Sequence, residues 1–157
     1  MDFLFPFHPR FVHFPIALSL VGVVFVAVSL VRREASERWF WAGRLLVFLG
    51  WIGALVAGVA GMIDQSRAPD LPVVRDTINM HITVGIALII VLGLALYWPL
   101  KDKRLLPDGS PQQGTRRGTR QGTRWGYLAL LLLGVGLVLL ESWLGGQLVY
   151  KLGVGVQ

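Results

Sequence analysis

The chain has 157 residues, of which 54% are hydrophobic and only 15% are charged, and its mean hydropathy is +0.62. This composition is too apolar for a soluble domain, so we expect most of the chain to lie in a lipid bilayer. The absence of cysteine excludes disulfides, thiolate metal sites and cysteine nucleophiles, while the net charge of +6 arises near the edges of apolar segments and favours lipid head groups over nucleic acid as the partner.

The first apolar segment covers about residues 12–31 and is long enough to span a bilayer. It contains no Asp, Glu, Lys or Arg, and Arg32 and Arg33 follow it. A cleaved signal peptide would carry its positive charge before the apolar core, so we expect this segment to be retained.

The second apolar segment covers about residues 45–63 and carries small residues three and four positions apart, namely Gly50, Gly53, Ala54, Ala57, Gly58 and Gly61. Small residues at this spacing allow helix backbones to approach closely in lipid. The pattern predicts a helix that packs tightly against its neighbours.

Two further spans are expected at about residues 78–98 and 125–148. Pro99 ends the first of them, and aromatic residues near both ends of the second are typical interfacial anchors. The predicted fold class is therefore all-α, an integral membrane four-helix bundle that forms a single transmembrane domain over residues 1–157.

The distribution of Lys and Arg predicts the orientation of this bundle. Eleven of the 15 basic residues fall in the linkers after the first and third segments. The positive-inside rule then places both linkers in the cytoplasm and both termini on the non-cytoplasmic side of a cell inner membrane or plasma membrane. Residues 101–124 include three Gly-Thr-Arg repeats, so we expect a flexible basic cytoplasmic loop, which either contacts anionic lipid or only sets the topology.

Polar residues that lipid tolerates poorly gather at the predicted non-cytoplasmic end, and all three histidines are among them: His8, His13, Asp64, Asn79, His81, Glu141, Ser142 and Gln147. An ionisable group at the centre of a membrane helix costs roughly 2.5–3.5 kcal/mol, so such groups usually have a partner or a task. Glu141 follows Trp125 by ~24 Å of helix and cannot easily reach solvent, so a neighbouring histidine is its expected hydrogen-bond partner.

His13 and His81 each lie near the start of a span, and we expect them at similar depth on two helices. Two neutral imidazoles in this arrangement can hold a haem from both faces. The leading hypothesis is therefore a membrane b-type cytochrome with His13 and His81 as axial ligands, or with His8 in place of His13. Glu141 or Asn79 would orient an imidazole, and electrons would pass near the outer face.

A second hypothesis replaces haem b with copper or zinc held by His8, His13 and His81, with Glu141 or Asp64 beside them. His8 and His13 are five positions apart, which is not the spacing of a ligand pair on one helix, so His8 would come from the segment before the helix. In a third hypothesis the polar cluster is structural and the bundle anchors a periplasmic or membrane redox partner.

Two terminal motifs resemble those of a bacterial family of four-helix membrane proteins of unknown function. They are the opening His8-Pro-Arg-Phe-Val-His13-Phe-Pro-Ile-Ala-Leu18 and the closing Trp143-Leu-Gly-Gly-Gln-Leu-Val-Tyr150. Some members are joined to Rieske or cytochrome modules, so the resemblance implies a redox setting. It also matches His8, His13 and His81 to the histidines of the family. The sequence contains no motif for hydrolytic chemistry, so any catalysis would be redox and belong to a cofactor.

Overall fold

The computed structural model describes residues 8–31, 36–65, 68–101 and 117–154. It contains four long helices, α1 (His8–Val31), α2 (Ser36–Asp64), α3 (Pro72–Lys101) and α4 (Arg117–Gly146), followed by the π-helix η4 (Gln147–Lys151). The described residues contain no strand. Each long helix carries a segment that is long and apolar enough to cross a membrane, so the predicted all-α four-helix membrane fold is confirmed.

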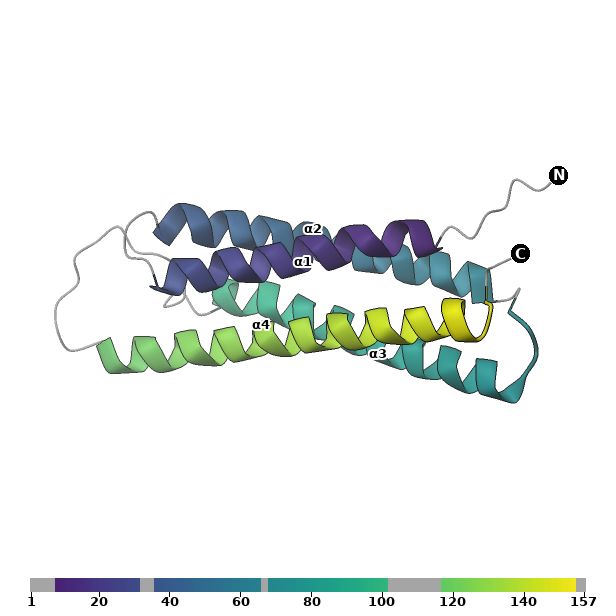
Figure 1. Cartoon of the computed structure of the whole chain (residues 1–157). Coiled ribbons are helices and arrows are strands. Elements are labelled where there is room, and N and C mark those ends of the chain that lie inside the picture. Colours follow the sequence, from purple (N-terminus) through teal and green to yellow (C-terminus); the bar gives the residue numbers. More distant parts are fainter. Residues whose placement is uncertain (1–7, 32–35, 66–67, 102–116, 155–157) are drawn as a thin grey trace.

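The helices alternate in direction, so the start of α1, the end of α2, the start of α3 and η4 lie together at one end of the bundle (Figure 1). We call this the terminal end, and we call the opposite end, where α1 finishes and α2 begins, the linker end. Both ends of the chain therefore leave the bundle on one side, as the sequence predicts. The side of the membrane that this end faces stays a prediction.

All four helices extend beyond the apolar segments that predict them. α1 begins at His8, so the prediction that His8 precedes the helix is wrong; Pro9 in the first turn is compatible with a helix because its missing N–H has no helical partner there. α4 begins at Arg117, so residues 117–124 are helical and the loop predicted over 101–124 is wrong there. Pro107 and Pro111 both precede this stretch, and arginine and glutamine favour helix. Residues 102–116 lie outside the described part of the chain.

α1 and α2 pack backbone against backbone through small residues. A Cβ atom added to Gly22 would lie 2.8 Å from the carbonyl oxygen of Gly43, and one added to Gly43 would lie 2.7 Å from that of Gly22. Close approach of this kind is what small-residue spacing provides in lipid, where helix association depends on van der Waals packing. The tight packing predicted for the small residues of the second span is found at Gly50 and Gly53, where an added Cβ atom would lie 3.1 Å from the Ser19 backbone nitrogen and 3.2 Å from Pro15 Cβ. It is not found at Gly58, where the nearest atom would be 4.0 Å away.

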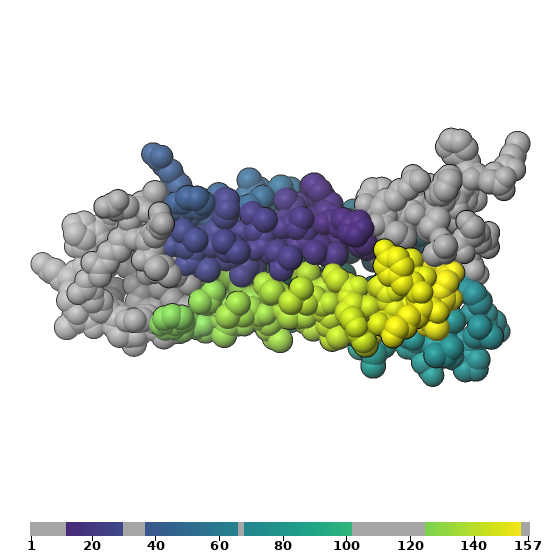
Figure 2. All heavy atoms as spheres, viewed as in Figure 1, coloured from purple at the N-terminus to yellow at the C-terminus, as the bar shows by residue number. Residues whose placement is uncertain are grey.

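The core of the bundle is concentrated toward the linker end. Its buried members are Val23, Val26, Phe40, Val47, Leu88, Leu92, Ala95, Tyr127, Leu131 and Val138. Side chains of α1 and α4 meet along the face shown in Figure 2, whereas α2 and α3 diverge toward the terminal end (Figure 1). In the terminal half of α2, after Gly53, only Ala57 is buried. The bundle is thus well packed in one half and more open in the half that carries the histidines.

Candidate functional site

His81 lies on the buried face of α3. Val74, Leu88 and Ala95 are buried and recur at intervals of seven residues, and His81 occupies the position between Val74 and Leu88 in that series. Residues seven apart return to nearly the same face of a helix. The imidazole therefore lies among packed side chains, and its side chain is only 14% exposed.

Glu141 occupies the equivalent position on α4. Tyr127 and Gly134 precede it at intervals of seven residues, Leu148 follows at the same interval, and all three are buried. The side chain of Glu141 is 21% exposed although it lies within an apolar membrane-spanning segment. The carboxylate therefore points into the helix interface and not into lipid.

The two residues contact each other across the α3–α4 interface. His81 Nδ1 lies 3.3 Å from Glu141 Oε1. Two glycines make room for this contact: a Cβ atom on Gly85 would lie 2.9 Å from Glu141 Oε1, and one on Gly145 would lie 3.5 Å from His81 Cε1. Each polar side chain therefore lies against a glycine of the opposite helix.

Part of the Glu141 carboxylate has no hydrogen bond in the described structure. Its Oε2 atom is buried and lacks a partner among the described residues. The neighbouring hydroxyl of Ser142 donates to the Val138 carbonyl of its own helix at 2.8 Å, so it does not supply one. An unsatisfied buried oxygen costs about 1–3 kcal/mol, so the fold tolerates a polar site that packing alone would not favour.

A helix irregularity follows the His81–Glu141 pair directly. η4 begins at Gln147, and the Leu152 N–H donates to the Gln147 carbonyl at 3.1 Å, a bond that spans five residues. Gly153 then takes a positive φ of 65° and ends the helix. π-Helical turns are rare and often occur at functional sites, so η4 is a second observation that favours a functional site at the terminal end.

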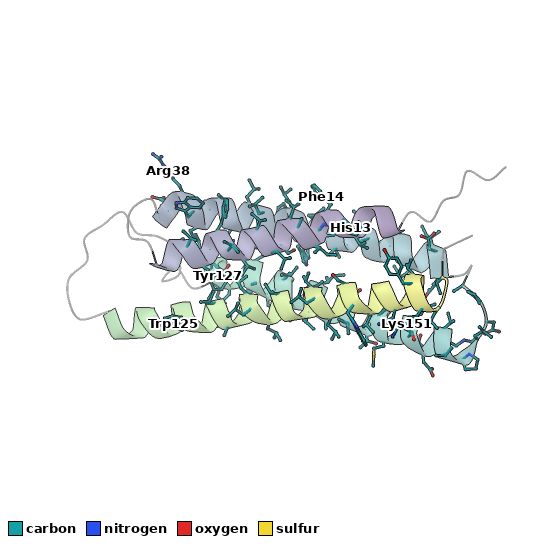
Figure 3. All side chains as sticks on the ribbon, viewed as in Figure 1. His13, Phe14, Arg38, Trp125, Tyr127 and Lys151 are labelled. Atoms are coloured by element: carbon teal, nitrogen blue, oxygen red, sulfur yellow. The ribbon has the colours of Figure 1, made fainter. Side chains whose placement is uncertain are left out.

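His13 stands apart from this pair. Its side chain is exposed on α1 (Figure 3), and α1 and α3 each pack against α2 and α4, so the two histidine-bearing helices are opposite each other in the bundle. No group of three or more His, Asp or Glu side chains in the described residues is arranged to hold a metal ion. His13 nevertheless shares a helix face with Ile16 and Leu20, which pack against the core.

The remaining predicted site residues are not part of the pair. Asn79 is exposed two positions before His81, which places it on a different face of α3. Asp64 is partly exposed at the end of α2. His8 begins α1, and its side chain lies outside the described part of the structure.

Sequence reasoning missed a second polar position, Arg44, by assigning it to a linker. In the structure Arg44 is buried, and its Nη2 donates to the Leu96 carbonyl of α3 at 3.1 Å. The aromatic run Trp39-Phe40-Trp41 that precedes it is unusual for a linker and is the signal that could have placed the start of the helix earlier.

A family model described as "Predicted membrane protein (DUF2231)" matches residues 4–157. The chain belongs to this family. The DUF2231 match covers every described helix, which agrees with the four membrane-spanning segments. No curated protein and no solved structure matches the chain. This DUF2231 protein is therefore a multi-pass membrane protein, and its description names no activity.

Proposed function

We propose that this DUF2231 protein binds haem b within the membrane and takes part in electron transfer, with His81 as an axial ligand. The observation that carries this proposal is the contact between His81 and Glu141 inside an apolar helix interface. Ionisable residues within membrane helices usually serve a function because their burial is costly.

The chemistry of the pair suits a ligand imidazole. Because Nδ1 faces Glu141, Nε2 on the opposite edge of the ring is the nitrogen that would bind iron. A carboxylate beside the other ring nitrogen fixes the orientation of a ligand histidine and raises its basicity. Bound haem would supply one-electron transfer.

The available donors fit haem better than a bare metal ion. A haem requires one or two axial ligands within apolar surroundings, whereas a copper or zinc site requires about three or four protein ligands. The described residues offer one oriented imidazole and contain no cluster of three ligands. Copper or zinc would require His8 and His13 to join His81, and this alternative is an outcome of the test below.

In this proposal His13 or His8 would provide the second ligand to the haem. Both residues lie on α1, opposite α3 in the bundle, and a planar cofactor between opposite helices presents one face to each. Electron transfer would take place at the terminal end, with a periplasmic or membrane redox protein as partner. The basic linker end would contact anionic lipid.

The test is an absorption spectrum of the full chain, expressed with ample haem precursor and purified in detergent. We expect a Soret band and sharp visible bands on reduction, which His81→Ala abolishes and Glu141→Gln shifts. Asn79→Ala is the matched control because Asn79 is exposed two positions from His81.

The separate variants His13→Ala and His8→Ala should identify the second ligand by converting the spectrum to that of a five-coordinate haem. A wild-type protein without a Soret band, or a His81→Ala variant with an unchanged one, would overturn the proposal. Elemental analysis that finds one equivalent of copper or zinc instead, lost in the histidine variants, would favour the metal-ion alternative.

A further inference from the structure

Arg44 is a positively charged side chain buried inside the bundle at the linker end. It is only 9% exposed. Its Nη2 donates to the Leu96 carbonyl at 3.1 Å, while its Nη1 is buried without a hydrogen-bond partner among the described residues. Among the described residues, the guanidinium therefore has an acceptor for Nη2 but none for Nη1, and the Tyr127 side chain also interacts with it.

The described side chains around the Arg44 guanidinium are aromatic, and none of those in contact with it is acidic. Its guanidinium lies 5.8 Å from the ring centroid of Phe40 and 5.7 Å from that of Trp41. Tyr127 of α4 closes the cluster, with its ring centroid 6.4 Å from that of Phe40. The ion pairs of the described residues join Arg75 to Asp70 and His81 to Glu141, and neither involves Arg44.

A buried cation without a counter-charge is unfavourable in a low-dielectric interior. The Leu96 carbonyl and the two aromatic faces offset part of that cost, because cation–π contacts strengthen as water is excluded. Neither the carbonyl nor the aromatic rings carry a negative charge, so the positive charge of the guanidinium is not neutralised by these contacts. A negatively charged group beside this guanidinium would therefore be favourable.

The depth of Arg44 indicates which anion can reach it. Trp41, Trp98 and Trp125 lie near the linker-end limits of the membrane-spanning segments of α2, α3 and α4, where tryptophan typically marks the head-group level of a bilayer. Arg44 lies one helical turn deeper than Trp41, and an arginine side chain can reach back over that distance. Lipid phosphates occupy this level.

Further basic residues lie at the linker end of the bundle. Arg120 and Arg124 belong to the opening part of α4, which begins at this end of the bundle. Lys101 ends α3 at the same end of the bundle. The linker end thus combines one buried cation with several basic positions around it.

We propose that Arg44 forms the centre of a binding site for the phosphate of an anionic phospholipid from the leaflet at the linker end. The planar guanidinium suits phosphate oxygens because it presents paired donors, and the aromatic side chains suit the glycerol and upper acyl region. The site is distinct from the His81–Glu141 pair and does not depend on haem.

The experiment measures lipid binding to the full chain in detergent by native mass spectrometry, with phosphatidylglycerol and phosphatidylcholine as probes. The wild-type protein should prefer phosphatidylglycerol, and Arg44→Gln should weaken its binding about tenfold or more, as expected for the loss of a charge-assisted hydrogen bond. Arg38→Gln is the matched control, because it removes the same charge from an exposed position on the same helix. It should leave binding within about twofold of wild type.

Equal losses in Arg44→Gln and Arg38→Gln would overturn the proposal, since they would indicate a diffuse surface charge. Competition by inorganic phosphate at the same concentration would also overturn it, in favour of a soluble anion. If Arg44→Gln does not fold, Arg44→Lys decides, because it keeps the charge but removes the paired donors of the guanidinium: weaker phosphatidylglycerol binding supports the site, and wild-type binding overturns it.

Discussion

Trp51 and Arg44 lie on one face of α2, and both donate hydrogen bonds to backbone carbonyls of α3. Trp51 Nε1 donates to the Ile89 carbonyl at 2.9 Å, and Arg44 Nη2 donates to the Leu96 carbonyl at 3.1 Å. The donors and the acceptors are each seven residues apart. The two bonds therefore fix the register of α2 against α3 over two helical turns.

Replacing Trp51 with phenylalanine should weaken this register. The variant Trp51→Phe removes the donor to the Ile89 carbonyl but keeps an aromatic ring, so we expect a loss of about 1 kcal/mol, in the usual range for interhelical hydrogen bonds in membranes. Unfolding by SDS in mixed micelles measures it. Trp143→Phe is the control because Trp143 is 59% exposed; equal losses in both variants would contradict the role given to this bond.

The contact between Gly22 and Gly43 predicts a marked difference between two glycine substitutions. A methyl group at Gly22 would meet backbone atoms of α2 at 2.8–2.9 Å, so Gly22→Ala should separate α1 from α2 and cost about 1–3 kcal/mol. Gly136→Ala adds a methyl group with nothing within 4 Å and should stabilise α4 by up to about 1 kcal/mol. Thermal unfolding in detergent compares the two variants. A Gly22→Ala protein as stable as wild type would show that the α1–α2 interface can relax.

The sequence identifies the membrane-spanning segments because the bilayer imposes a minimum apolar length. It fails at the helix ends, since helical hydrogen bonding does not stop where the apolar run stops. Residues 36–44 and 117–124 lie outside the apolar runs and are still helical. The apolar pattern therefore assigns Arg44 to a linker, whereas the structure buries its side chain inside the bundle.

The sequence predicts which residues of the candidate site are unusual, but it does not predict which of them contact each other. His81 and Glu141 stand out because ionisable residues are rare within membrane helices. A position along a helix gives the depth of a residue, but depth does not tell which helix is its neighbour. That α3 packs against α4 and lies opposite α1, and hence that His81 contacts Glu141 and not His13, required the structure.

The predicted orientation can be tested directly because the chain contains no cysteine. Single cysteines at Asp70, in the terminal-end segment with 82% side-chain exposure, and at Arg38, exposed at the linker end, report on opposite sides. The positive-inside rule predicts that a membrane-impermeant maleimide labels Asp70→Cys in intact cells and labels Arg38→Cys only after permeabilisation. The reverse pattern would place the termini in the cytoplasm.

A double-mutant cycle on His81 and Glu141 separates a functional pair from a structural one. Either single substitution, His81→Leu or Glu141→Leu, removes the contact between the two side chains and leaves the other polar group in an apolar interface, so each should cost about 1–3 kcal/mol in the haem-free protein. The double variant removes both polar groups and the unsatisfied Oε2 of Glu141 and replaces them with apolar volume. Buried polar pairs exchanged in this way are often neutral or stabilising, so the double variant should be at least as stable as wild type.

The readout of this cycle is the free energy of unfolding in mixed micelles, followed by haem titration of each variant that folds. A double variant that is stable but no longer binds haem would mean that the pair lowers the stability of the protein and is needed for haem binding, as expected of a functional site. A double variant less stable than either single one would instead assign the pair to helix packing, since two well-placed polar groups would then be contributing net binding between α3 and α4.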